Sequence, residues 1–463
     1  MRKARVFLAG LFCLGLLVLV PLAQGVQAAE GGKGGQSIRL EFEEFKLENG
    51  LRVILAEDHS APTYSISVTY DVGSRNERPG RTGFAHLFEH MMFQGSEKVG
   101  KGEHFILIFN NGGGMNGTTN VDRTNYYETL PANQLDLGLF LEADRMRSLV
   151  INQANLDNQR NAVQEERRLS VDNRAYGKTF EAIFETAYDN FAYKHSTIGS
   201  MADLDAATVE DVAEFFRIYY APNNAVLSLV GDFKKKEALA KIEKYFGDIP
   251  AQPPPSEPDM TEPEQKGERR KTLEDSFARL PRVDIVHKIP PANTPDWYAL
   301  DVLGEVLASG QSSRLYQKLV KEEQVAVAAA GGVFMFRGPS ILLLLALARP
   351  GKEMAEIEKL IYEEIERLKN EPIEDWELEK VRMQLRRQRA QQLQSTSFRA
   401  QTLGEYAVYF DDPGLINTIG EKYLQVSKED VQRVARKYLK QSNRTVITTV
   451  PKPAETAEAK LGE

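Results

Sequence analysis

The feature that most constrains the fold of this 463-residue chain is an internal repeat. Near the end of each half, a Glu-Asp-Val triplet is followed by a tyrosine, an asparagine and a strand-like run. These landmarks stand at residues 210–212, 219 and 224, and again at residues 429–431, 438 and 443, so the offset is 219 residues throughout. Residues 83–95 match residues 298–310 at a similar offset of 215 and place two apolar helical patterns in register. Two matches in the same order indicate a duplicated domain.

A proline-rich segment separates the two halves. Residues 249–270 contain six prolines among polar and charged residues, and therefore have little apolar surface to bury. We interpret this segment as a linker. It divides the chain into a first domain at residues 29–248 and a second domain at residues 271–452, followed by a tail at residues 453–463.

The first 28 residues have the composition of an export signal. Basic residues at positions 2, 3 and 5 precede an apolar run at residues 6–20, and Val-Gln-Ala at residues 26–28 fits a cleavage site. We predict a mature chain that begins near Ala29, is exported across the inner membrane to the periplasm and has no membrane span. The alternative is an uncleaved anchor, because the apolar run is only slightly shorter than the ~20 residues that span a bilayer.

The overall composition argues against two classes of protein. Acidic residues outnumber basic ones by 66 to 58, which gives a net charge of −8, and no long basic stripe is present. Nucleic acid is therefore a poor partner, and peptides or proteins are better ligands. Apolar residues at 42% and charged residues at 27% are typical of soluble folded domains rather than multi-span membrane proteins. The only cysteine, Cys13, lies in the export signal, so disulfides do not stabilise the mature chain.

Helical and strand patterns alternate within each half. Apolar residues at three- and four-residue spacing predict helices, whereas alternating or β-branched stretches, including one around the turn dipeptide Asn49-Gly50, predict strands. The predicted helices lie at residues 83–93, 135–149 and 156–170, and the predicted strands at residues 45–55, 64–71 and 226–230. Each half is thus predicted to be a sheet with helices packed on it.

His86, Glu89 and His90 form the pattern with the clearest chemical meaning. Residues four apart on a helix lie on one face, so both imidazoles can reach one ion, and Glu89 borders that face. A catalytic zinc typically has three protein ligands and one water, and a carboxylate beside that water can remove its proton. The order H-x-x-E-H is the inverse of a common metallopeptidase motif. We therefore predict that His86 and His90 bind zinc and that Glu89 is the catalytic base.

The alternative is that the two histidines are structural. The surrounding helix is strongly apolar, however, and a buried Glu89 needs a partner, which a metal supplies. A third ligand has to come from elsewhere, and residues 161–167 offer two adjacent acids, Glu165 and Glu166. Composition does not choose between these two.

With these motifs, essentially the whole mature chain resembles the pitrilysin/insulinase family of zinc metallopeptidases, also called M16. The resemblance implies an α+β fold of two homologous halves, each a mixed and mainly antiparallel sheet packed with helices, and it implies Zn²⁺ as the cofactor. In that family a glutamate ligand follows the inverted motif at the spacing of Glu166, which leaves Glu165 as a solvated neighbour. The family usually has a further glutamate seven residues before this ligand, where the present chain has Gln159. This departure is expected to weaken the orientation of the site.

Residues 112–118 resemble the family's segment at an exposed edge strand, where the backbone of a substrate adds as an extra strand. The resemblance implies that Asn116, Gly117 and Thr118 bind substrate. Glycine at such a place permits close approach of another backbone. Read without the resemblance, this glycine-rich segment is an ordinary loop.

The second half lacks the metal-binding pattern. In the repeat alignment, Asp301, Gly304 and Glu305 stand opposite the two histidines and the glutamate of the motif. The family often has an arginine and a tyrosine in this half that help to bind substrate, and the corresponding residues here are Val320 and Val327. The resemblance therefore implies a heterodimer, in which a homologous partner without zinc supplies the Arg/Tyr pair.

The resulting hypothesis is a zinc-dependent endopeptidase that hydrolyses peptides or unfolded polypeptides, similar to the zinc-bearing subunit of processing peptidases. One alternative is a non-catalytic scaffold or assembly subunit of the same family, which the intact motif disfavours. Another is an enzyme that cleaves a thioether in a modified sugar with the same inverted motif, but that enzyme is far shorter and is not duplicated.

Overall fold

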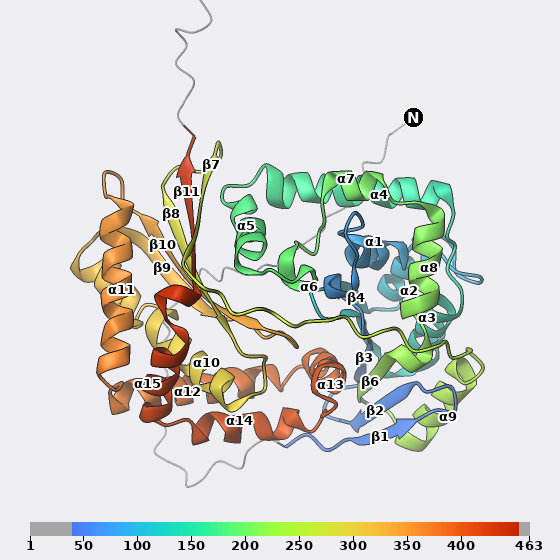
Figure 1. Ribbon diagram of the computed structural model, residues 1–463. Helices are drawn as coiled ribbons and strands as arrows, with labels where there is room; N and C mark the ends of the chain where they lie inside the picture. Colours follow the sequence, from blue (N-terminus) through green and yellow to red (C-terminus); the bar gives the residue numbers. More distant parts are fainter. Residues whose placement is uncertain (1–38, 453–463) are drawn as a thin grey trace, which may run out of the picture. The chain divides into compact units, whose positions relative to one another are not determined.

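Two mixed β-sheets form the framework of the computed structural model, which describes residues 39–452 (Figure 1). The predicted export signal with Cys13 and the predicted tail at residues 453–463 lie outside this range. The first sheet has the strand order β1-β2-β6-β3-β5-β4 and the second has the order β7-β11-β8-β10-β9. The strands are β1 (Glu43–Lys46), β2 (Arg52–Glu57), β3 (Thr63–Tyr70), β4 (Gly114–Thr119), β5 (Thr124–Pro131), β6 (Ala225–Gly231), β7 (Arg269–Asp275), β8 (Arg282–Ile289), β9 (Ala326–Val333), β10 (Ser340–Ala348) and β11 (Arg444–Pro451).

The two sheets have the same topology once β1 is set aside. In each half the first long strand pairs in parallel with the last one, β2 with β6 and β7 with β11. The remaining neighbours in both sheets are antiparallel. Two sheets with this shared order are what a duplicated domain produces, and they confirm the predicted α+β class with two similar halves.

Helices pack on both sheets and include the three that the sequence pattern predicts. The first half contains α1 (Phe84–Met91), α2 (Glu103–Asn110), α3 (Leu135–Arg147), α4 (Gln153–Arg167), α5 (Gly177–Ala187), α6 (Phe191–Lys194), α7 (Met201–Asp205), α8 (Val209–Tyr219) and α9 (Lys235–Phe246). The second half contains α10 (Pro295–Ala308), α11 (Met354–Asn370), α12 (Asp375–Gln392), α13 (Thr396–Phe410), α14 (Leu415–Gln425) and α15 (Lys428–Tyr438). Helix α4 begins earlier than predicted because Asn152 caps it, and a π-helical turn at Arg168–Asp172 continues it.

The repeated sequence landmarks form the same local structures in both halves. Helices α8 and α15 each begin with a capping box, made by Thr208 and Asp211 in the first half and by Ser427 and Asp430 in the second. Beyond the other end, an asparagine side chain donates to the carbonyl of the last helical tyrosine, at 2.8 Å in the first half and 2.9 Å in the second. The repeat therefore marks where a helix starts and how the chain turns into the following strand.

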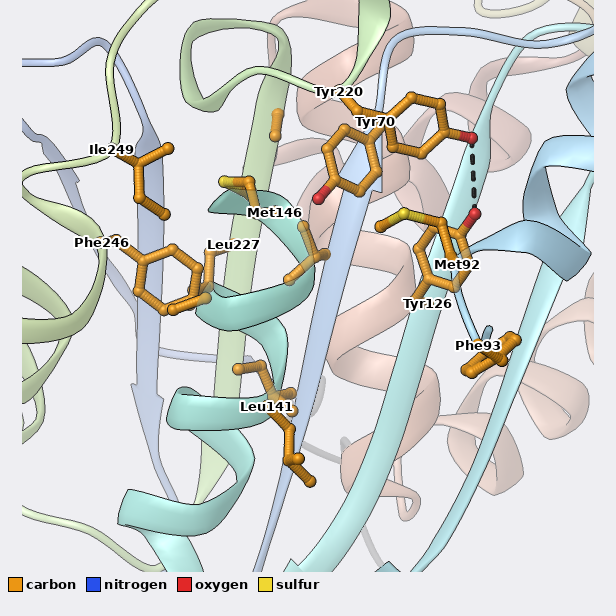
Figure 2. Close-up of a cluster of buried hydrophobic side chains, with 14 of the residues drawn as sticks. Tyr70, Met92, Phe93, Tyr126, Leu141, Met146, Tyr220, Leu227, Phe246 and Ile249 are labelled. Atoms are coloured by element: carbon orange, nitrogen blue, oxygen red, sulfur yellow. Dashed lines mark hydrogen bonds between the residues drawn. The ribbon is translucent and has the colours of Figure 1, made fainter. Parts of the chain in front are cut away.

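A core of aromatic residues holds the first sheet against α1 (Figure 2). Tyr70 of β3, Tyr126 of β5 and Tyr220, which follows α8, gather there, and the Tyr126 and Tyr220 hydroxyls lie 3.4 Å apart. From α1, the ring of Phe88 lies 4.1 Å from that of Tyr220 between centroids. Because such a close-packed core allows little rearrangement, the position of α1 relative to the sheet is well defined.

Each half also contributes one helix to the sheet of the other half (Figure 1). Helix α13 of the second half packs on β3 and β6, and α5 of the first half packs on β7, β8 and β11. Apolar clusters fill both contacts, with Leu403 against Val226 in one and Ile183 against Val286 in the other. Gly404 lets α13 approach closely, since a Cβ atom there would lie 2.5 Å from the Thr69 hydroxyl oxygen. Two smaller apolar clusters therefore join the halves, and each half also has a core of its own.

The predicted linker has no helix or strand from residue 250 to residue 268. The expectation that it buries little is wrong for its second part. Met260 packs against the cluster beneath α5, the Lys288 ammonium donates to Glu262 at 2.6 Å, and Gln265 is buried. These contacts fasten the segment to the second sheet. Within residues 39–452, no helix combines the length and apolar character needed to cross a membrane.

Candidate metal centre

Helices α1 and α4 pack against each other and bring together three side chains that can bind a metal. His86 Nε2 lies 3.7 Å from Glu166 Oε1, and His90 Nε2 lies 3.3 Å from Glu166 Oε2. One donor atom from each of the three side chains lies within 4.8 Å of the others. A tetrahedral ion with bonds of about 2.0–2.1 Å separates its ligand atoms by roughly 3.4 Å. The spacing of these atoms therefore suits a single ion of that size.

The protonation of His86 and Glu166 also fits a metal, whereas burial would lower the pKa of His90 but Glu166 and Glu89 raise it. Burial and the neighbouring His90 lower the pKa of His86 to about 4, so its imidazole is neutral at physiological pH, as a metal ligand must be. Burial alone would raise the pKa of Glu166, but the hydrogen bond from His90 and the adjacent imidazoles lower it, and the side chain is a carboxylate. Two imidazoles and one carboxylate form a donor set that catalytic zinc sites use.

A buried carboxylate fixes the N-terminal end of α1. Gly83 directly precedes the first residue of the helix, its φ of 86° is accessible to glycine, and it has no side chain to cap the helix. Instead, the backbone amides of Gly83 and Ala85 donate to the two carboxylate oxygens of Glu77, at 2.9 and 2.8 Å. Glu77 in turn lies 2.9 Å from His195 Nε2. A negative charge at this end complements the helix dipole, so Glu77 holds the helix that carries the histidines.

Glu89 lies between α1 and the edge strand β4. Its side chain is only 6% exposed, and burial raises its pKa, which favours a role as a proton acceptor near neutral pH. The Thr119 hydroxyl, on β4, donates to Glu89 Oε2 at 2.5 Å and so orients the carboxylate. Gly117 makes room for it, since a Cβ atom at that residue would lie 3.1 Å from Glu89 Cγ.

The predicted substrate-binding residues lie within β4 itself, at the free edge of the first sheet. Asn116 is exposed, Gly117 is buried against Glu89, and Thr118 is partly exposed. In the described part of the chain β4 pairs only with β5, so its other edge has backbone groups to which an extended peptide can bind. The structure therefore brings this segment next to Glu89.

The two acids left open by composition point in different directions. Glu166 faces the histidines, whereas Glu165 is exposed and pairs with Arg168 of its own helix at 3.1 Å. Gln159 lies two turns earlier on α4, is largely buried, and donates to Asn158 at 2.7 Å. It also interacts with His90, so an amide occupies the place beside the site where the family usually has a carboxylate.

A second group of potential ligands consists of His104 of α2, Glu128 of β5 and Glu142 of α3. All three are buried, but Arg145 is buried with them and forms an ion pair with Glu142. Burial raises the pKa of Glu128 to about 8, so this carboxyl is protonated at neutral pH and can share a hydrogen bond with His104 over 3.3 Å. Because an arginine already balances the charge, the group is better explained as an internal polar network than as a cation site.

The second half has no comparable set of ligands among the described residues. Asp301, Gly304 and Glu305 lie on α10, the helix that corresponds to α1, and the Tyr423 hydroxyl donates to Asp301 at 2.6 Å. Val320 lies partly buried against the second core, and Val327 is exposed on the edge strand β9. Neither valine side chain can donate a hydrogen bond.

Sequence reasoning missed four residues near the site: Glu77, Thr119, Arg123 and Glu405. Thr119 could have been suspected because it directly follows the predicted edge segment. Arg123 lies in the turn between β4 and β5, and its guanidinium donates to Glu405 of α13 at 3.1 Å. No local pattern connects Glu405 to the site, because 282 residues separate it from Arg123.

Comparisons with known proteins bear on the family to which this chain belongs. A family model described as "Insulinase (Peptidase family M16)" matches residues 52–201, which include all four proposed metal-site residues, and one described as "Peptidase M16 inactive domain" matches residues 206–385. The zinc protease PqqE of Helicobacter pylori is 31% identical over 90% of this chain and 94% of its own length. The mitochondrial-processing peptidase subunit beta of Bos taurus is 28% identical over 45% of this chain and 44% of its own length. The crystal structure of a protease from Helicobacter pylori superposes with a TM-score of 0.86 at 29% identity, and the match covers 89% of this chain and 100% of that one.

Proposed function

We propose that this chain, which belongs to peptidase family M16, is a zinc-dependent endopeptidase that hydrolyses peptides or unfolded polypeptides. The observation that carries the proposal is the convergence of His86, His90 and Glu166 beside the buried Glu89. A relative at 31% identity is named as a zinc protease, which supports the choice of metal. His86, His90 and Glu166 would hold the ion.

The mechanism follows from the side chains around Glu89. Zinc, when bound, supplies Lewis acidity, which polarises a carbonyl and lowers the pKa of water from about 16 to about 7. Glu89, oriented by Thr119, accepts a proton from the attacking water at its carboxylate and passes it to the nitrogen of the leaving amine. Strand β4 holds the substrate backbone in an extended conformation, with Asn116, Gly117 and Thr118 closest to the scissile bond. Burial of Glu89 keeps bulk water away from this proton transfer.

The proposal includes a partner subunit. Val320 and Val327 stand where the family often has a substrate-binding arginine and tyrosine, so this chain needs donors from elsewhere to hold the substrate. A homologous M16 subunit without zinc ligands would supply them in a heterodimer. Co-purification of the native protein, combined with metal analysis, tests partner and zinc together. Full peptidase activity of the isolated chain as a monomer or homodimer would contradict the partner requirement.

The proposed location is the periplasm, on the basis of the export signal in residues 1–28. N-terminal sequencing of the protein from the native cell envelope would distinguish a mature chain beginning near Ala29 from a retained anchor.

A Glu89→Gln variant tests the catalytic role. Loss of a general base lowers kcat by about 10²–10⁴-fold, and the glutamine should leave the zinc content unchanged because Glu89 is not one of the three proposed ligands. The matched control is Glu305→Gln on α10, which removes a carboxyl from the corresponding helix of the second half and should leave kcat unchanged. If the protein is instead a non-catalytic scaffold of the family, the wild type hydrolyses no unstructured peptide and Glu89→Gln leaves its assembly intact.

A further inference from the structure

Helix α13 brings two polar side chains from the second half to the edge strand of the first sheet. The Arg123 guanidinium donates to Glu405 of α13 through Nε, at 3.1 Å, and through Nη1 to the Thr118 carbonyl oxygen and hydroxyl, at 3.0 and 2.6 Å. One residue beyond β4, Asn120 exchanges two hydrogen bonds with the Tyr409 hydroxyl of α13, at 2.9 and 3.1 Å. Both ends of the turn that follows β4 are thereby fastened to α13.

The same strand is in direct contact with Glu89. The Thr119 hydroxyl donates to Glu89, and Gly117 lies against the Glu89 side chain. Thr118, which Arg123 holds, lies between these two residues. A shift of β4 along or away from the sheet would therefore move the hydrogen-bond donor of Glu89 and the backbone edge together.

We propose that Arg123 and Glu405, supported by the Asn120–Tyr409 pair, position β4 beside Glu89, so that a helix of the second half sets the geometry of the site in the first. This inference rests on the proposed function for its catalytic consequence. Arg123 and Glu405 are positioning residues: they act on the reaction through Thr118 and Thr119. The second half then has a defined task at the site although its own helix α10 has no metal ligands.

The pair is suited to this task because of its burial and its geometry. The side chains of Arg123 and Glu405 are 13% and 21% exposed, so their ion pair is screened less than a surface pair. Arginine makes directional bonds from several nitrogens at once, which lets Arg123 bind the carboxylate of one half and the strand of the other.

The chain offers a closely matched control on the same helix. Arg399 of α13 pairs with Asp58 of the first half, and these side chains are 12% and 21% exposed. This pair also joins the two halves, but Asp58 lies in the turn after β2, and three strands separate β2 from β4 in the first sheet. Removing either ion pair should weaken the attachment of α13 to the first half to a similar degree. Only the loss of the Arg123–Glu405 pair should affect the edge strand β4.

The experiment compares Glu405→Gln, Tyr409→Phe and Arg399→Gln in the full chain. Amide hydrogen exchange of residues 114–119 is measured first, since it requires no activity. Glu405→Gln should accelerate exchange in this strand by about 10-fold, the factor expected for losing one charge-assisted hydrogen bond, and Tyr409→Phe should do so to a smaller degree. Arg399→Gln should leave exchange in this strand at the wild-type rate. Exchange of β4 that is unchanged in Glu405→Gln, or equally fast in Arg399→Gln, overturns the proposal.

Peptide hydrolysis then tests the catalytic consequence. In Glu405→Gln, kcat should fall about 10-fold while the zinc content stays at the wild-type level, because small displacements of a catalytic group have effects of this order. An unchanged kcat in Glu405→Gln, with an active wild type, overturns the positioning role. A wild type that hydrolyses nothing overturns the proposed function instead, and hydrogen exchange still decides whether the pair positions β4.

Discussion

Helices α1 and α10 have equivalent positions in the two halves, but their polar side chains differ. Helix α1 carries two histidines and a glutamate, whereas α10 carries carboxylates and no histidine. Helix α1 packs against α4, which turns Glu166 toward His86 and His90. Helix α10 packs against α12, where Lys380 interacts electrostatically with Glu305. In the first half, burial keeps His86 neutral and able to donate its lone pair. In the second half, α10 and α12 bring Glu305 close to Asp301 and Lys380.

The difference shows what the shared fold contributes to chemistry. The order of strands and the packing of a helix pair are the same in both halves, so the fold alone does not make a metal centre. Two further conditions have to be met: neutral nitrogen donors on one helix, and a carboxylate on the helix that faces it. In the second half α10 has no histidine and the described residues form no comparable ligand group, and the proposed contribution of this half to the site comes through α13.

The largest effect is expected at the carboxylate of α4. Glu166→Gln should weaken zinc binding by more than about 100-fold, because loss of a ligand should exceed the effect of losing a group that only supports one. Peptide hydrolysis should be lost with it. Zinc affinity is measured by competition with a chelator, followed by metal analysis. The adjacent Glu165→Gln is the matched control and should retain wild-type affinity. Equal zinc affinities of Glu166→Gln and Glu165→Gln would mean that Glu166 is not a ligand. The proposed difference between the α1–α4 and α10–α12 pairs would then be wrong.

An effect of intermediate size is expected when the edge strands β4 and β9 are compared. A valine in place of Gly117 on β4 would press against Glu89 and Tyr126, whose nearest atoms already lie 3.1 and 3.2 Å from the position of a Cβ. We expect kcat for an unstructured peptide to fall by about 10–100-fold with zinc retained, since displaced catalytic groups lose rates of this order.

The matched control for Gly117→Val is Gly332→Val on β9, the edge strand of the second sheet, where nothing lies within 4 Å of a Cβ. This variant should hydrolyse the peptide at the wild-type rate. If both valines reduce kcat equally, the effect is one of general stability, and the contrast between the two edges fails.

The smallest effect concerns Asp301, which stands opposite His86 in the repeat. Burial and the charge of Glu305 raise the pKa of Asp301 to about 7, against the lowering effect of the Tyr423 hydrogen bond. A carboxyl with a raised pKa in the folded state costs stability when it ionises, so this cost grows from about pH 4 to pH 7 and is constant above. Asp301→Asn should therefore stabilise the protein at pH 8, where a shift of about three pKa units corresponds to at most about 4 kcal/mol, and hardly at all at pH 4.

Urea unfolding at the two pH values measures this difference, and Asp296→Asn on the same helix is a control of opposite sign. Burial would raise the pKa of Asp296, but hydrogen bonds from Lys437, Tyr438 and Arg433 lower it to about 2. Replacing Asp296 should lower stability at pH 8. A destabilised Asp301→Asn at that pH would show that the second half needs this charge, as the first half needs its carboxylate.

Much of the fold could be predicted because its signals are local. Capping residues, helical periodicity and the turn at Asn49-Gly50 act over a few positions, and the structure places helices α1, α3 and α4 and the β1–β2 hairpin within a few residues of the predicted bounds. The predicted family and fold class are confirmed. The zinc ligands, the base and the substrate residues remain predictions, although their side chains lie together as expected. The buried part of the linker was missed because its anchors, Met260, Glu262 and Gln265, are single residues that form no periodic pattern.

The sequence by itself determined the duplication, the α+β class and the placing of two histidines and a glutamate on one helix. A repeat is found by comparing two segments of the chain, and helical spacing is a property of neighbouring residues. Only the tertiary structure decided which distant groups complete that arrangement. It turns Glu166 rather than Glu165 toward the histidines, puts the Thr119 hydroxyl on Glu89, and brings Glu405 to the edge strand from the other half. These contacts depend on how α1 packs against α4 and on how α13 of the second half packs against the first sheet. Packing of this kind is settled by the whole core together, and no stretch of sequence encodes it alone.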